Sequence, residues 1–299
     1  MRPSTLRRFK GDRKAASPTV STVIITGAIV TLLLTVTIYT YDFLDQRIAE
    51  NEFATMKQFM QNTALQIDDV AWIPGKTQTI RYASRAGHLA VLDNVIHFTV
   101  KVDSVELASV NSAAIMFNIP ISKFTLGNNY YEQIFPQPSP SGSVLLYEGV
   151  SATTGRVFVV EKIPMDDGNY LRIVAVPSIR YLISTLPSAS GGQVVRIRVF
   201  LPTLKAASNH PMRSQSMTLS SINLLVNTTR VNGEIEFEIS FPQASRGFDS
   251  KFFFNAANAS EPFKETLKID DIVPDQSNVR EIMVEFYVGE VLCTLGLHG

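Results

Sequence analysis

The chain has 299 residues and a formal net charge of zero, long enough for one large domain or two ordinary ones. Of the 27 basic and 27 acidic side chains, six basic ones and one acid precede Asp42, which leaves 21 against 26 and a net charge of −5 for the rest. A body of that sign lacks the basic surface that binds nucleic acid, so no nucleic-acid partner is expected. The single cysteine, Cys293, excludes an intrachain disulfide.

The first expected element is a transmembrane helix over residues 20–41. This run is uncharged and long enough to cross a hydrocarbon core about 30 Å thick at a rise of 1.5 Å per residue. Its polar members are mostly Ser and Thr, whose hydroxyls can donate to carbonyls of the same helix. The basic residues before the run should stay in the cytoplasm, which sends everything after Asp42 outside the cell. The run ends without a small-x-small site, which disfavours a discarded secretory signal.

Residues 13–30, RKAASPTVSTVIITGAIV, place a base and small residues directly before the apolar run. This segment resembles the amino terminus of archaeal type IV pilins and pilin-like proteins. Val20 stands where bacterial type IV pilins carry a glutamate, which favours the archaeal pattern. Residues 164–180 and 286–299 also resemble uncharacterised archaeal proteins with this amino terminus, and that likeness implies no activity.

The resemblance implies that a membrane prepilin peptidase removes a basic leader, residues 1–15, by cutting between Ala15 and Ala16. The apolar helix is then retained, first as an anchor and, in members that polymerise, as part of the filament core. The residues that the peptidase would recognise are Lys14, Ala15, Ala16 and Ser17.

One long helix is expected over residues 16–73, transmembrane over 20–41 and amphipathic over 42–71. No Pro or Gly occurs between residues 28 and 73, and Pro74-Gly75 then supplies a stop. The second part carries an apolar stripe at helical spacing. This stripe can pack on the chain's own domain or be shared with neighbouring subunits. Its members are Ala49, Phe53, Met56, Met60, Thr63, Ile67 and Val70.

After Pro74 the hydrophobic period changes to two, which predicts strands. Many short strands without alternating helices indicate a mainly antiparallel, sandwich-like β ectodomain, so the fold class is α+β. Either two β subdomains, 76–187 and 192–299, or one continuous domain, 76–299, fits the pattern. Within it we expect a hairpin turning at Ala86-Gly87, one strand over 95–107, and short helices near 179–186 and 248–254.

No motif for catalysis or for a metal or cofactor is present, so no enzyme, metal site or cofactor is expected. The four histidines are scattered, and Cys293 lies in an apolar strand, where a buried inert thiol is expected. The three Asp pairs (68–69, 166–167 and 270–271) are expected to be solvated helix ends or turns. Asn227 and Asn258 begin sequons, which makes them candidate sites of N-glycosylation.

These features predict a pilin-like subunit of an archaeal type IV pilus-like surface filament, with a structural or adhesive role. The alternative is a membrane-anchored extracellular binding module or minor pilin that does not polymerise in bulk, and an anchored hydrolase is a third class. The expected location is the cell membrane and surface. The expected partners are the membrane, prepilin peptidase and copies of the chain itself or related pilins.

Overall fold

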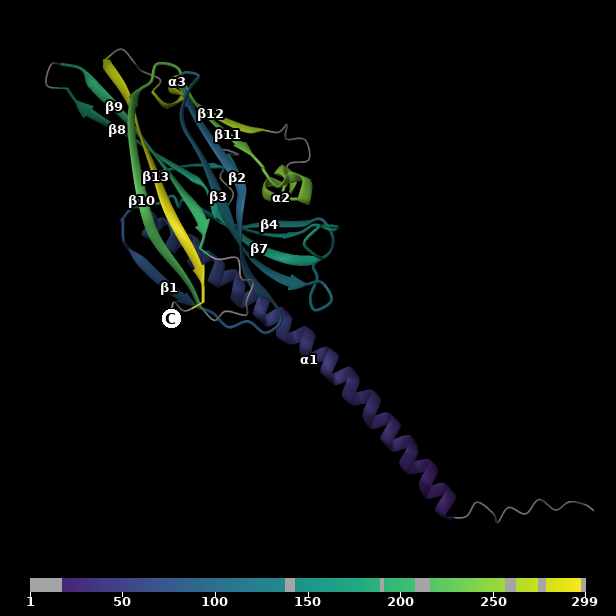
Figure 1. Cartoon of the computed structure of the whole chain (residues 1–299). Coiled ribbons are helices and arrows are strands. Elements are labelled where there is room, and N and C mark those ends of the chain that lie inside the picture. The colour runs from purple at the N-terminus through teal and green to yellow at the C-terminus, as the bar shows by residue number, and fades with distance from the viewer. Residues whose placement is uncertain are drawn as a thin grey trace, which may run out of the picture. The chain divides into compact units, whose positions relative to one another are not determined.

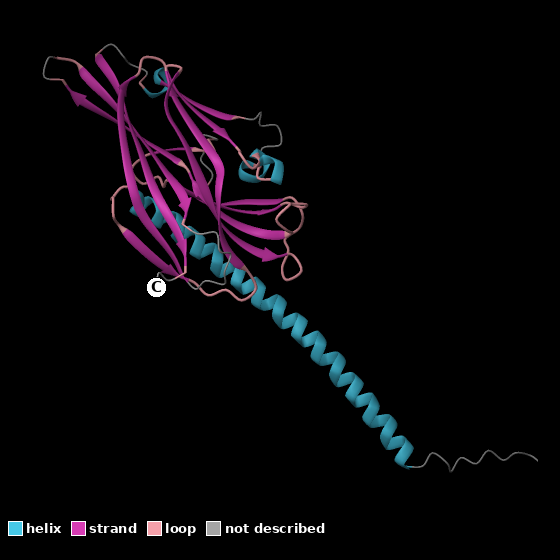
Figure 2. Cartoon of the chain, viewed as in Figure 1, coloured by secondary structure: helices cyan, strands magenta, loops and turns pink. Residues whose placement is uncertain are grey.

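The computed structural model describes residues 18–137, 143–188, 191–207, 216–255, 262–273 and 278–296. One long helix and two β-sheets account for most of these residues, which confirms the α+β class (Figures 1 and 2). The chain divides into two units, Met1–Arg47 and Ile48–Gly299. The expected leader and the cleavage motif Lys14–Ser17 lie outside the described residues.

The first unit holds the apolar part of helix α1 (Pro18–Ala71). Among the described residues this helix is long and apolar enough to cross a membrane, with a mean hydropathy of 2.2 in its most apolar window. Every side chain from residue 20 to residue 44 is exposed. Four threonines donate their hydroxyls to the carbonyl four residues earlier, as the sequence predicts, so these groups need no solvent. They are Thr26, Thr31, Thr35 and Thr40.

The remainder of α1, from Ile48, forms part of the second unit and lies in its core. All seven residues of the predicted stripe are buried. Four residues outside the stripe are buried too, namely Glu52, Phe59, Ala64 and Ala71. The helix ends at Ala71, before Pro74 and Gly75, and Gly75 adopts a φ of 82°. Within this unit, then, the apolar face of the helix packs on the chain's own body.

The first sheet, sheet A, has six strands in the order β1-β10-β13-β9-β8-β5. Its two central strands, β9 and β13, run parallel over most of their length, and β5 pairs with β8 in parallel. The other pairs are antiparallel. The bounds are β1 (Thr77–Arg81), β10 (Ser216–Arg230), β13 (Val279–Leu295), β9 (Gln193–Ala206), β8 (Ile179–Pro187) and β5 (Leu146–Glu148).

The second sheet, sheet B, has seven strands in the order β12-β11-β2-β3-β7-β6-β4, all antiparallel. Two short helices, α2 (Ser250–Phe254) and α3 (Ile269–Ile272), lie in its connections. The bounds are β12 (Phe263–Lys268), β11 (Glu234–Ser240), β2 (His88–Val102), β3 (Val105–Pro120), β7 (Tyr170–Pro177), β6 (Gly155–Glu161) and β4 (Tyr130–Phe135).

Two hydrophobic cores follow from the alternation of side chains along these strands. One core lies between the sheets, where Phe98 and Val100 of β2 join Ile197 and Val199 of β9. The other surrounds α1 and takes the opposite face of β3. Its β3 members are Ala113, Ile115, Phe117 and Ile119. Because β3 is buried on both faces at this point, its sequence reads as a continuous apolar run.

Two glycines let strands approach the helix closely. A Cβ on Gly289 of β13 would lie 2.5 Å from the carbonyl oxygen of Ala71, and one on Gly155 of β6 would lie 2.7 Å from that of Ala64. Contacts this short are not tolerated between carbon and oxygen atoms. Small residues are therefore required on both sides of these helix-strand contacts.

A buried carboxylate fixes the start of the packed part of α1. Glu52 accepts backbone N–H groups of Arg85 (2.8 Å), Ala86 (2.8 Å) and Gly87 (3.1 Å), and the hydroxyl of Ser84. Burial opposes ionisation, but the hydrogen bonds from Ser84 and these backbone groups outweigh it and lower the pKa of Glu52. The carboxylate thus binds the connection between β1 and β2.

A second carboxylate fixes the end of the same helix. Asp68 accepts the indole N–H of Trp72 (2.8 Å), the hydroxyl of Thr154 (2.8 Å) and the guanidinium of Arg180 (3.1 Å). Its side chain is largely enclosed. The expectation that Asp68 belongs to a solvated pair is therefore wrong, because three groups from three separate elements converge on it.

The expected hairpin at Ala86-Gly87 does not form. β1 pairs with β10 in sheet A, whereas β2 pairs with β3 and β11 in sheet B, so residues 82–87 cross from one sheet to the other. The strand expected over 95–107 is interrupted by a two-residue turn at Asp103-Ser104, where both φ angles are positive. Asp103 then accepts three backbone N–H groups from residues 232–234.

The segment expected to separate two subdomains instead joins β8 to β9, which pair antiparallel in one sheet. Each sheet takes strands from both 76–187 and 192–299, and residues 48–299 form one compact unit. The helix expected near 179–186 is strand β8, while the one expected near 248–254 is found as α2. Curled strands and two parallel pairs depart from a simple antiparallel sandwich (Figure 1).

Replacing Gly289 with alanine should destabilise the body, because the added methyl group collides with the backbone of α1 at Ala71. Overpacking of this kind costs about 1–3 kcal/mol of unfolding free energy. Thermal unfolding of the full chain in detergent, followed by circular dichroism, measures the loss. Gly27→Ala is the control, since a Cβ there meets no atom within 4 Å; equal midpoints for both variants would contradict this packing.

Glu52→Gln should lower the unfolding free energy at neutral pH by about 1–3 kcal/mol, because a charged acceptor of four hydrogen bonds is lost. A carboxylate whose pKa is lowered in the folded state stabilises above its unfolded value, about 4.3, and that contribution fades as the pH falls through the folded value. Urea unfolding from neutral to acidic pH should therefore show less acid-induced loss in Glu52→Gln than in the wild type. Glu106→Gln, exposed on β3, should match the wild type.

Candidate functional site

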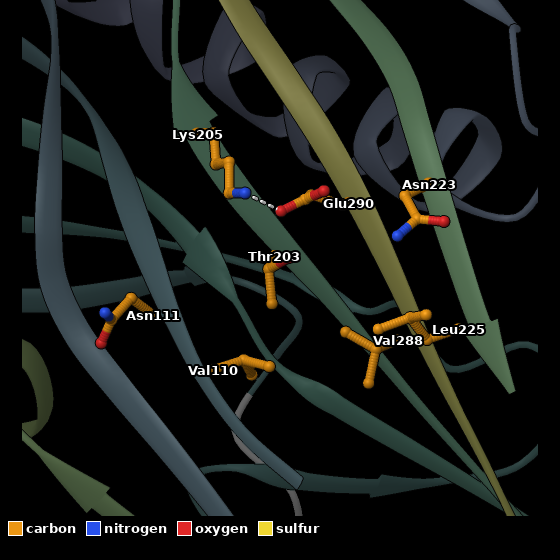
Figure 3. A pocket seen from close by; sticks show the side chains of 8 residues that line it. All are labelled: Val110, Asn111, Thr203, Lys205, Asn223, Leu225, Val288 and Glu290. Carbon is orange, nitrogen blue, oxygen red and sulfur yellow. Dashed lines mark ion pairs between the residues drawn. The ribbon is translucent and has the colours of Figure 1, made fainter. Parts of the chain in front are cut away.

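A groove lies between β3 and β10 in the described part of the body. Two adjoining hollows of about 250 Å³ and about 320 Å³ share Val110, Leu225 and Val288, and together they make one groove. β3 supplies one wall and β10 the other, with β9 and β13 between them (Figure 3). The further lining residues are Leu107, Ala108, Ser109, Asn111, Thr203, Lys205, Asn223, Val226, Asn227, Phe286 and Glu290.

Each wall of the groove is a strand whose outer edge is paired with another strand over only part of its length. β1 pairs with residues 216–220 of β10, and β7 pairs with residues 115–120 of β3. No described strand pairs with the outer edge of β10 over 222–230 or of β3 over 105–114. Both backbone edges therefore present unpaired N–H and C=O groups beside the groove.

A β-bulge at Ile222 sets which side chains of β10 line the groove. The register with β13 shifts between Ser221 and Asn223, which exchanges the two faces of β10 from this point on. Beyond the bulge Leu225 lies opposite Val288. Val288 is 6% exposed, whereas Leu225 is 57% exposed because no strand of sheet B covers it. The groove is thus the uncovered margin of the core between the sheets.

Polar groups mark one end of the groove. Lys205 of β9 and Glu290 of β13 form an ion pair there (Figure 3). Thr203 is buried below them, and Asn111 and Asn223 stand on the two walls. Among the described lining residues these two alone are charged, and they are paired with one another.

The lining offers surface for binding and no evident catalytic chemistry. The described lining residues include no histidine or cysteine, and their one acid, Glu290, is paired with Lys205. Within the described ranges no three His, Cys, Asp or Glu side chains gather as a metal site would require. Apolar side chains beside unpaired backbone suit an extended, uncharged segment of protein better than a small charged ligand.

Among the residues singled out from the sequence, only Asn227 lies in the groove, where it is exposed on β10. Asn258 lies outside the described residues, as do His210 and His298. His97 contacts Asn111 and His88 contacts Asn118, each on β3. Cys293 is buried in the core around α1, and burial, with the nearby charge of Asp93, raises its pKa to about 12.

Sequence reasoning missed the groove, since its walls come from segments that are far apart in the chain. One signal was present. Residues 216–229, SMTLSSINLLVNTT, contain no charged residue, proline or glycine, and edge strands of soluble proteins usually carry such residues as protection against pairing.

No protein-family model, curated protein or solved structure matches this chain. Its function therefore has to be argued from its own residues.

The thiol of Cys293 should resist alkylation in the folded chain, because at about pH 8 a group with so high a pKa holds almost no thiolate. Iodoacetamide labelling followed by mass spectrometry should modify Cys293 only in denaturant. A Val105→Cys variant, exposed on β3, should be labelled under native conditions and serves as the positive control. Labelling of wild-type Cys293 in the native state at a comparable rate would contradict its burial.

Proposed function

We propose that this chain is a pilin-like subunit of an archaeal type IV pilus-like surface filament. Prepilin peptidase would cut between Ala15 and Ala16, and α1 would hold the processed chain in the membrane until it joins copies of itself or related pilins. The ectodomain would lie outside the cell as a sandwich-like body that is structural or adhesive, with Asn227 and Asn258 as candidate glycosylation sites. Catalysis is no part of this role.

The observation that carries the proposal is the difference in burial between the two parts of α1. The side chains of residues 20–41 are uncharged and exposed, whereas one face of the helix from Phe53 to Ala71 is buried in a protein core. A cleavable secretory signal has no reason to continue without interruption into the core of the domain it exports. A retained helix that anchors the chain and also forms part of the ectodomain core is expected to continue in this way.

The groove favours a second candidate, a membrane-anchored binding module or minor pilin that does not polymerise in bulk. Its apolar lining and unpaired edges would hold a partner without any filament. The two roles share the anchor and the processing step, and they differ in whether the chain is found in sheared filaments.

The amino terminus of the protein made in its own host tests the processing step. We expect mature chains that begin at Ala16. Ala15→Leu should leave membrane insertion intact and block cleavage, because the peptidase must bind extended backbone there. Intact-mass measurement of the membrane fraction reads both results, and Ser4→Leu, in the same leader, is the matched control.

Retention of Met1–Ala15 would overturn the pilin-like interpretation and leave an ordinary anchored protein. An amino terminus beyond Tyr41 would instead identify a secretory signal. Where cleavage at Ala16 is found, mass spectrometry of sheared filaments separates the two candidates: presence supports the filament subunit, and consistent absence supports the anchored binding module.

A further inference from the structure

We propose that residues 222–230 of β10 pair antiparallel with the same strand of a second copy, so that sheet A continues across two molecules. This inference rests on the proposed function in one respect, the anchoring of both copies in one membrane. It does not depend on processing or on filament formation.

Over residues 222–230, β10 offers a long backbone edge that no described strand pairs with. Its run of uncharged residues extends to Thr229, and Leu225 and Val226 are 57% and 54% exposed. The unpaired edge of β3 carries Glu106, and the unpaired part of β8 is shorter, 182–187, and ends in a proline. The outermost strands of the two sheets are protected. β5 and β1 have three and five residues, β4 carries Glu132, and β12 carries Lys264, Glu265 and Lys268. Edges without charge, proline or shortening pair with another strand.

Charge points to a second copy as the occupant. A strand with charged side chains facing Leu225 or Val226 would lose their hydration without gaining a counter-charge. The chain's own β10 is neutral from Ile222 to Thr229 and equal in length. Its one charge, Arg230, lies at the end of the segment in an ion pair with Glu281. Antiparallel self-pairing about a twofold axis brings the residue at the axis opposite its own counterpart, so an axis at Leu224 or at Val226 would place two identical apolar side chains against one another.

The size of the contact explains why confinement in a membrane matters. Nine residues of strand extend about 30 Å at 3.3 Å per residue. A single strand pair of that length buries far less than the roughly 800 Å² per partner of a standard interface, so it is weak between freely diffusing molecules. Two copies anchored in one membrane meet at a high effective concentration, which compensates for the small area.

Cysteine cross-linking of the full chain in phosphatidylcholine liposomes tests the pairing. Leu224→Cys, Val226→Cys and Thr228→Cys are compared under mild oxidation. Only the position nearest the axis should give a strong disulfide dimer, because a position two residues from the axis lies about 13 Å from its counterpart along the strands. Val105→Cys and Val150→Cys, exposed elsewhere on the body, should remain monomeric.

A charge placed near the axis should break the contact. Leu225→Lys (with Leu224→Cys or Val226→Cys) or Asn227→Lys (with Thr228→Cys), added to the best cross-linking variant, should reduce the dimer fraction about tenfold. Each added lysine is then one residue from the axis, so the two like charges lie close together across the adjoining strands. Val150→Lys in the same background should leave the dimer fraction unchanged. Circular dichroism of both lysine variants checks that the body is folded.

Three results would overturn the pairing. They are no dimer at any β10 position in chains that have inserted, equal cross-linking at β10 and at the two control positions, and full glycosylation of Asn227 in the native host, which would cover the strand. Each is independent of the amino terminus found in the host, so this inference can fail while the proposed processing stands.

Discussion

Burial of the second part of α1 is the constraint on which the body depends. Sheet B turns one face of β3 toward the core between the sheets and the other toward the helix, with Ile115 and Phe117 among the residues that meet it. Without the helix, this second face and the adjoining ends of β9, β10 and β13 would expose a contiguous apolar surface. At about 1.5–3 kcal/mol for each large side chain, such exposure would exceed the net stability of a domain. The membrane-capable part of α1 and the part buried in the core of the body therefore belong to one continuous helix.

Two buried carboxylates give this packing its register. A helix held only by apolar contacts can slide or rotate at modest cost, because hydrophobic attraction has no direction. Glu52 and Asp68 lie at the two ends of the packed segment, and each accepts several donors from strands or connections that are distant in the chain. Displacing the helix by one turn would leave both charges buried without partners, which is far more costly than a loss of apolar contact.

The sequence was informative wherever local pattern decides structure. The helix, its buried stripe, the return of threonine hydroxyls to helix carbonyls and most strands could all be read from period and composition. The predicted hairpin at Ala86-Gly87 is wrong because the local pattern suggested that its two strands pair with one another. Instead Glu52, far earlier in the chain, binds the connection where the chain crosses between the sheets. The single strand predicted over 95–107 is wrong because a turn at Asp103-Ser104 divides it. That turn is stabilised by the backbone N–H groups of residues 232–234, which donate to Asp103. The groove could not be predicted from periodicity, since it arises where β1 and β7 end, and the end of a neighbouring strand leaves no periodic signal in β3 or β10. The uncharged run over 216–229 was the one sign of an exposed edge.

An exposed, neutral strand edge is a hazard for a freely diffusing protein, because any other exposed edge can pair with it. A membrane anchor would reduce this hazard in two ways. It excludes most soluble strands from sustained contact, since a weak pair dissociates quickly unless both partners are confined. It also restricts encounters largely to other anchored chains, of which copies of the same chain carry a complementary neutral edge. The proposed pairing would thus turn a feature that promotes aggregation in solution into a selective contact at a membrane surface, and it would account for the absence from residues 222–229 of the charges that protect β4 and β12.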